Sequence, residues 1–133
     1  MNKISILEND FISIWAFPER KLVHSVMHTY VFGDAFRNAL TRICEAMESY
    51  QLTKWLGDLQ AQSAVPPDDL EWTSSYWRPR MMAAGWKHWA IVLPTKVIGQ
   101  VRMERVSKLF GEQGLDARTF VDPDEALRWI DGL

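Results

Sequence analysis

The first part of the chain consists of short apolar runs separated by turn-forming residues. The runs cover residues 4–7, 11–17 and 22–27, and the breaks fall at Asn9, Asp10 and Pro18. Short apolar runs bounded by such residues are typical of β-strands, because Asn, Asp and Pro favour turns. The pattern therefore predicts an N-terminal meander of two or three strands.

The spacing of apolar positions changes to that of a helix after residue 35. Apolar side chains recur at i, i+3, i+4, i+7, i+8 and i+11, at Phe36, Ala39, Leu40, Ile43, Cys44 and Met47. This spacing predicts an amphipathic helix, with Gly33 or Asp34 as its cap. Cys44 falls on the apolar face, so we expect an inert core residue and not a nucleophile.

The rest of the chain alternates strand-like and helix-like segments. We expect a strand ending near Asp58, a helix from Pro66 toward Gly85 that kinks or breaks at Pro79, a strand at 89–93, a helix at 97–112, a strand at 117–121 and a helix starting at Asp122. Pro loses nothing at the first helical position but removes a backbone bond inside a helix. The continuous apolar run at 89–93 indicates a strand covered on both faces.

The resulting order, β-β-β-α-β-α-β-α-β-α, predicts a single α/β domain over residues 1–133. Successive strand–helix–strand units form right-handed crossovers into parallel strands. We expect an N-terminal β-meander followed by βαβαβα, in a mixed sheet of about five strands packed against about four helices.

Charge and composition bear on three possibilities: nucleic-acid binding, membrane insertion and secretion. Basic residues concentrate between Arg78 and Lys108, where Glu104 is the only acid, although the whole chain carries a net charge of −2. Such a stretch can bind an acidic partner or a phosphate, or can be an ordinary solvated face. The rest of the chain carries an excess of acidic residues, which disfavours nucleic-acid binding. No apolar run approaches the roughly 18 residues that cross a bilayer, and the polar N-terminus does not resemble a signal peptide. We therefore expect a cytoplasmic protein without a membrane span.

Several short motifs, in order, resemble those of the small bacterial SpoIIAA-like proteins, a branch of the STAS-type fold. The resemblance covers essentially the whole chain. It is carried by Trp55, Asp58, residues 66–69, Trp72, Trp77, Pro79, Arg80, Ala84, Gly85, Lys87, Arg118, Phe120, residues 124–126 and Trp129. It implies a mixed sheet of about five strands with helices packed against it.

The resemblance does not carry a phosphorylation switch with it. Better-known STAS relatives are anti-sigma factor antagonists, switched at a serine within an Asp-x-Ser…Asp-Ser-x-Gly pattern. Here Ser63 is the nearest candidate, but it precedes a double proline and no Ser-x-Gly follows. We therefore predict no phosphorylation site and no inherited anti-sigma role, since a fold does not fix a function.

Two groups of residues are candidates for binding. Asp58 and Lys96 follow predicted parallel strands, whose carboxyl ends are where open sheets bind ligands, although Asp58 also suits a structural cap or pair. The chain also has seven tryptophans, too many to be fully buried in so small a core. With Trp77 pointing inward, Trp72 and Tyr76 remain near a rim. The candidate ligand- or partner-binding residues are Trp55, Asp58, Trp72, Tyr76, Trp77, Arg78, Arg80 and Lys96.

The rim has three alternative interpretations: an aromatic pocket for an apolar ligand, the anchor of a homodimer, or tryptophans that merely fill space. The arginines beside it favour a protein surface. No metal site is expected, because His24 and His28 lack a third ligand with suitable spacing and the acids at 68, 69 and 71 suit a helix start. The sequence contains no Gly-rich phosphate loop or nucleophile elbow, so we predict no cofactor and no catalytic set.

We therefore predict a non-enzymatic, regulatory STAS-like module, homodimeric, that binds a protein partner or small ligand. The alternative is a carrier or sensor of a small apolar or amphipathic molecule. A third interpretation is an enzyme that uses Asp58 and Lys96.

Overall fold

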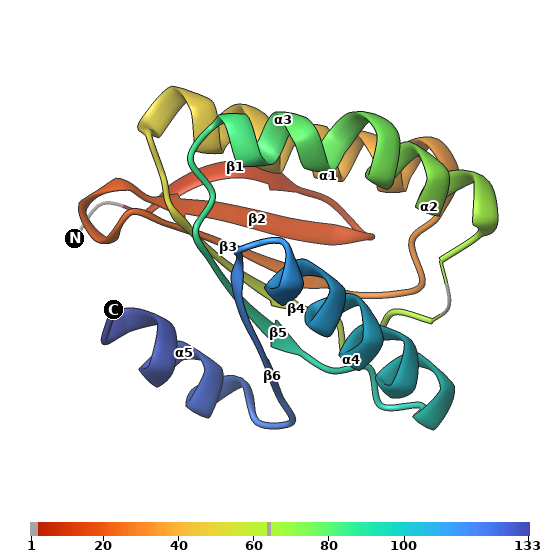
Figure 1. Ribbon diagram of the computed structural model, residues 1–133. Helices are drawn as coiled ribbons and strands as arrows, with labels where there is room; N and C mark the ends of the chain where they lie inside the picture. Colours follow the sequence, from red (N-terminus) through yellow and green to blue (C-terminus); the bar gives the residue numbers. More distant parts are fainter. Residues whose placement is uncertain (1–2, 64) are drawn as a thin grey trace.

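The computed structural model describes residues 3–63 and 65–133, which form a six-stranded mixed sheet in the order β1-β2-β3-β4-β5-β6 (Figure 1). The strands are β1 Ile4–Glu8, β2 Ile12–Phe17, β3 Leu22–Met27, β4 Lys54–Asp58, β5 His88–Val92 and β6 Asp116–Phe120. The first three pair antiparallel, and β3 to β6 pair parallel.

The sheet has six strands where about five were expected. The apolar run at 4–7, the least certain strand of the meander, forms β1, which pairs with β2 at the edge of the sheet and changes register between Ser5 and Leu7. Its side chains are only half-buried or exposed. An edge strand with one irregularity gives a weak alternation of apolar and polar residues, which explains why the sequence left the number open.

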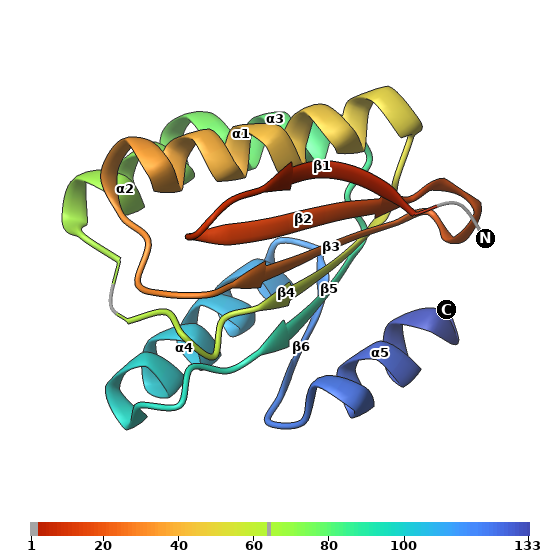
Figure 2. The ribbon, with the colours of Figure 1, turned by 180° about the vertical axis from the view of Figure 1, so that it is seen from behind.

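Helices cover both faces of the sheet unequally (Figures 1 and 2). The helical segments are α1 Gly33–Tyr50, α2 Pro67–Trp72, the π-helical η2 Thr73–Trp77, α3 Arg78–Ala83, α4 Val97–Glu112 and α5 Pro123–Asp131, with a 3₁₀ turn, η1 Pro18–Arg20. Right-handed crossovers between parallel neighbours place α1, α2 to α3 and α4 on one face. That face holds the large core, whereas α5 covers β4 to β6 on the other.

Helix α1 begins differently from the prediction. Its N-cap is Phe32, whose side chain makes no capping bond, and neither Gly33 nor Asp34 is the cap. Instead the backbone N–H of Gly33 donates to Oδ2 of Asp69 at 2.7 Å. A carboxylate distant in sequence thus satisfies an amide that the first turn leaves unpaired, a role that local spacing does not reveal.

The helix predicted to kink or break at Pro79 continues through that residue without a break. Instead a π-helical turn, Thr73–Trp77, joins α2 to α3, and Pro79 lies in the first turn of α3. A proline ring clashes with the carbonyl four residues earlier, and a wider turn relieves this clash. The predicted interior strand is confirmed, because Trp89 to Val92 are buried between β4 and β6.

Candidate functional site

A cavity of about 550 Å³ lies between the helical segment α2 to η2 and helix α4, on the face of the sheet that carries the large core. Its walls are mostly apolar. They include Met27, Leu40, Trp55, Trp77, Trp89 and Phe110. A volume of this size falls within the roughly 300–1,000 Å³ of small-molecule sites. Because parallel strands β4 and β5 end beside it, the cavity occupies the edge where open α/β sheets bind ligands.

Tryptophans form the floor of the cavity. Trp55 and Trp89 are register partners on β4 and β5, so their rings stack with centroids 5.1 Å apart and an interplanar angle of 6°. Trp77 meets Trp55 edge to face at 5.5 Å, and Trp86 packs against all three. Offset and edge-to-face contacts of this kind fix ring positions. The floor is therefore built from rigid rings.

Most indole N–H groups of this cluster have an acceptor. Nε1 of Trp77 donates to the Leu40 carbonyl at 2.8 Å, and Nε1 of Trp55 donates to Oγ of Ser25 at 2.9 Å. Trp89 differs: its side chain is 4% exposed, and its Nε1 has no hydrogen-bond partner in the described part of the chain. A buried donor without an acceptor costs about 1–3 kcal/mol. Trp89 also lines the cavity.

One loop of the cavity wall is held by a buried glutamine. Gln62 accepts a hydrogen bond from the Val31 amide through Oε1 and donates to the Val31 carbonyl through Nε2, both at 2.9 Å. This pair ties the loop after β4 to the segment between β3 and α1. Ser63, the nearest phosphorylation candidate, lines the same cavity and is half-buried.

The rim residues from the sequence are only partly associated with the cavity. Trp55 and Trp77 line it, but Trp72 and Tyr76 pack against each other outside it, with ring centroids 5.7 Å apart. As expected, Trp77 points inward and Tyr76 lies exposed. The seven tryptophans divide into four buried and three half-buried residues, in agreement with the argument that not all fit in the core.

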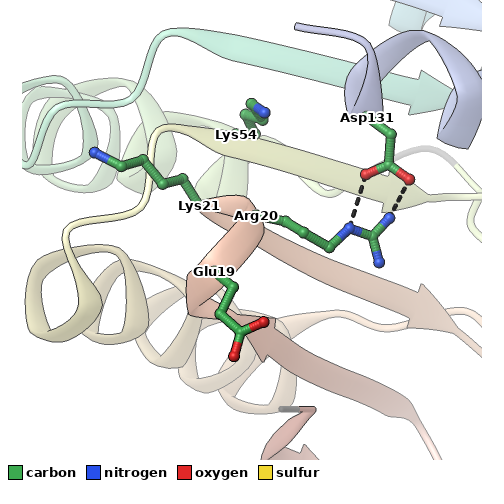
Figure 3. Close-up of a pocket in the computed structure, with 5 residues that line it drawn as sticks. All are labelled: Glu19, Arg20, Lys21, Lys54 and Asp131. Carbon is green, nitrogen blue, oxygen red and sulfur yellow. Dashed lines mark hydrogen bonds and ion pairs between the residues drawn. The ribbon is translucent and has the colours of Figure 1, made fainter. Parts of the chain in front are cut away.

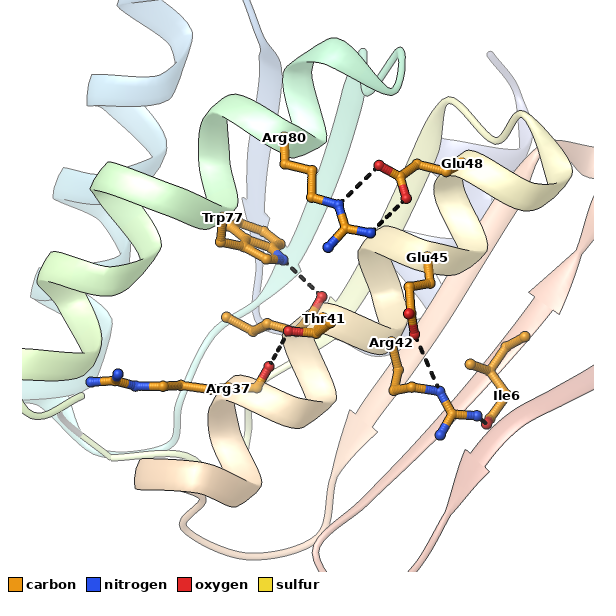
Figure 4. A network of polar contacts seen from close by, with 9 residues as sticks. Ile6, Arg37, Thr41, Arg42, Glu45, Glu48, Trp77 and Arg80 are labelled. Atoms are coloured by element: carbon orange, nitrogen blue, oxygen red, sulfur yellow. Dashed lines mark hydrogen bonds and ion pairs between the residues drawn. The ribbon is translucent and has the colours of Figure 1, made fainter.

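The two arginines beside this rim already have partners. Arg80 forms two hydrogen bonds to the Glu48 carboxylate, at 2.9 and 2.8 Å, which link α3 to α1 (Figure 4). The same hydrogen bond lowers the pKa of Glu48 below its usual value. Arg78 stacks over the Phe110 ring at 5.4 Å. Arg80 therefore connects α3 to α1, and Arg78 connects α3 to α4.

Asp58 and Lys96 both lie at the end of the sheet where β4 and β5 finish. Asp58 ends β4 on the face that α5 partly covers, where its carboxylate accepts from the backbone and side-chain amides of Gln60 at 3.1 and 3.0 Å. Lys96 is the exposed N-cap of α4. Within the described ranges no ion pair joins them. The Thr95 amide donates to the carbonyl of Gln60 at 3.3 Å, so the loops that carry the two candidates are in contact.

Histidines gather on the same face as Asp58. His28 and Ser13 share a hydrogen bond of 2.7 Å, and His24 packs edge-on against Trp15. Among the described residues, no group of three or more His, Cys, Asp or Glu is placed to hold a metal ion. Burial lowers the pKa of His24 below its usual 6.5, opposed by Asp58 and assisted by Arg20 and Lys3.

We expect protonation of His24 to destabilise the fold. Because the folded state holds the neutral imidazole, its stabilisation is complete above pH 6.5 and is lost as the pH falls below that value. Urea unfolding across this range measures the slope. His24→Leu should remove this part of the pH dependence, and His28→Asn should keep it. An unchanged slope in His24→Leu would show that another group causes it.

Cys44 lies buried in α1, as predicted. Burial raises the pKa of its thiol to about 11. We expect no reaction with iodoacetamide in the native protein near neutral pH, because both access and thiolate formation are suppressed. Full labelling should follow in denaturant, and mass spectrometry reads both states. Rapid native labelling would contradict this position.

A second hollow, of about 620 Å³, opens at the opposite end of the strands (Figure 3). It is lined by Glu19, Arg20, Lys21, Lys54 and Asp131. Arg20 pairs with Asp131, and Nζ of Lys54 donates to the carbonyl of Leu133 at 3.0 Å. These pairs tie η1 and β4 to the end of α5. The polar residues of this hollow thus connect η1 and β4 to the C-terminal end of the chain.

Sequence reasoning missed the contribution of α4 to the cavity. Ile98, Val101, Arg102, Met103, Arg105 and Val106 all line it. The sequence predicted a helix at 97–112 without placing any of its apolar residues in a binding site. The available signal was the excess of apolar residues at its start, because Val97, Ile98 and Val101 remain exposed. A helix with more apolar surface than its core contact needs indicates an additional binding surface.

Comparisons with family models, curated proteins and solved structures found no match. Among the described residues, no helix combines the length and the apolar character needed to span a bilayer.

Proposed function

We propose that this chain is a non-enzymatic binding module of the SpoIIAA-like, STAS-type kind that holds a small, largely apolar molecule between α2 and α4, as a carrier or sensor. The observation that carries the proposal is the aromatic cavity of about 550 Å³, whose walls include Trp55, Trp77 and Trp89. The order of elements supports the family resemblance.

The chemistry of the walls favours binding over catalysis. Apolar side chains supply most of the surface, and the only titratable side chains among the described lining residues are two arginines. Arginine stays charged and does not exchange protons at neutral pH. An apolar molecule would gain free energy by leaving water, about 0.8 kcal/mol for each buried methylene.

Linear alcohols of increasing chain length test this proposal. Binding followed by tryptophan fluorescence should tighten about fourfold with each added methylene. The gain should stop once the cavity is full. Val106→Trp, which fills the cavity from α4, should abolish binding, whereas Val121→Trp places the same change on an exposed residue outside it.

Circular dichroism confirms that both variants are folded, and Met103→Trp provides a second occluding variant. Absence of saturable binding, or equal binding by Val106→Trp and the natural chain, would contradict the proposal. Native mass spectrometry of freshly purified protein gives an independent result, because a co-purifying molecule should disappear in Val106→Trp.

The homodimer stays a prediction. Tyr30 and Phe32 stack with ring centroids 5.2 Å apart and leave apolar surface exposed before α1. Exposed aromatic surface of this kind suits a protein interface. Light scattering with size-exclusion chromatography at several concentrations tests the dimer, and a monomer at high concentration would contradict it.

A further inference from the structure

Two exposed arginines of α4, Arg102 and Arg105, line the cavity together with its apolar walls. They occupy one side of the helix, because residues three apart are neighbours on a helical surface. The described lining residues include no aspartate or glutamate. The cavity is thus lined by two positive charges and no negative one.

These arginines also differ from several others in the chain. Arg37, Arg42 and Arg80 each have a carboxylate within 4 Å, at 2.9, 3.8 and 2.8 Å respectively. Across residues 3–63 and 65–133, no such ion pair involves Arg102 or Arg105. Their guanidinium groups therefore keep their donors available to a molecule that enters the cavity.

We propose that the ligand of the cavity is an aliphatic chain that carries a carboxylate, which Arg102 and Arg105 bind while the chain lies against Trp55 and Trp89. This inference rests on the proposed function, and it further specifies that the ligand carries a negative charge. A guanidinium presents paired N–H donors that match the two oxygens of a carboxylate. The apolar walls then accommodate the chain, whose burial supplies most of the affinity.

Three probes of equal chain length isolate the charge: decanoate, decanol and decylamine, each kept below the concentration at which it forms micelles. Decanoate should bind about tenfold more tightly than decanol, and decylamine should bind most weakly. Because the arginines are exposed, added salt should reduce the advantage of decanoate and leave decanol unchanged.

The double variant Arg102→Gln/Arg105→Gln should remove the preference for decanoate and keep the affinity for decanol. Its matched control is Lys108→Gln/Arg128→Gln, which loses the same net charge at exposed positions that do not line the cavity. The control should keep the preference, which separates local binding from long-range attraction.

The outcomes distinguish the two proposals. If decanol binds as tightly as decanoate, or if the control loses the preference as fully as the arginine variant, the carboxylate inference fails and the apolar site stands. If none of the three probes binds saturably, both fail. A decanoate preference lost only in Arg102→Gln/Arg105→Gln supports both.

Discussion

Trp55→Ala should lower the free energy of unfolding by about 3–5 kcal/mol, the largest effect we expect for a single substitution in the aromatic cluster. Trp55 is buried, stacks on Trp89 and contacts Trp77 and Trp86. Its removal leaves a void that β4 cannot close without moving β5. It also leaves Oγ of Ser25 without its indole donor.

Urea denaturation followed by far-ultraviolet circular dichroism measures this loss without depending on tryptophan emission. Trp72→Ala provides the matched control, because Trp72 is half-buried and lies outside the cavity. We expect the control to cost about 1 kcal/mol. Equal losses in the two variants would show that Trp55 is not the centre of the core.

Asp69→Ala should cost about 2–3 kcal/mol, although Asp69 lies in the first turn of a short helix. Asp69 is 3% exposed, and its carboxylate accepts hydrogen bonds from two groups of α1: the Gly33 amide at 2.7 Å and Nε of Arg37 at 2.9 Å. The substitution leaves the first amide of α1 without an acceptor. Arg37 keeps partial contact with water, which limits the loss.

The adjacent Asp68→Ala is the control, since Asp68 is exposed in the first turn of α2, where a favourable interaction with the helix dipole is worth about 0.3–1 kcal/mol. Asp69→Asn keeps an oxygen for Gly33 and should fall between the two alanine variants. Similar unfolding free energies for Asp69→Ala and Asp68→Ala would contradict the capping role of Asp69.

Much of the fold could be predicted from local patterns, because the buried face of a helix or strand gives its apolar residues a characteristic spacing along the sequence. The helix with Phe36 and Met47 on its apolar face appears as α1, and the strand that includes Trp89 is interior. The capping residue of α5 was also predictable: Asp122 accepts from the Asp124 amide at 2.9 Å, directly before Pro123. Each of these features depends on neighbours in sequence.

The site was harder to predict because it depends on long-range geometry. Asp58 and Trp55 are three residues apart on one strand, yet alternation places them on opposite faces of the sheet. The cavity joins β4, η2 and α4, whose relative positions no local pattern specifies. In the sequence, Arg102 and Arg105 are compatible with an ordinary solvated helix face. In the structure they line the same cavity as Trp55, Trp77 and Trp89.

The indole N–H resonances of the seven tryptophans test the central claim most directly, because they report on both faces of the sheet in one spectrum. Titration of ¹⁵N-labelled protein with decanol should shift the resonance of Trp89, assigned with Trp89→Phe, together with those of Trp55 and Trp77. Trp15 and Trp129, which do not line the cavity, should stay unchanged. Shifts confined to Trp15 and Trp129, or none at all, would contradict a ligand site between α2 and α4.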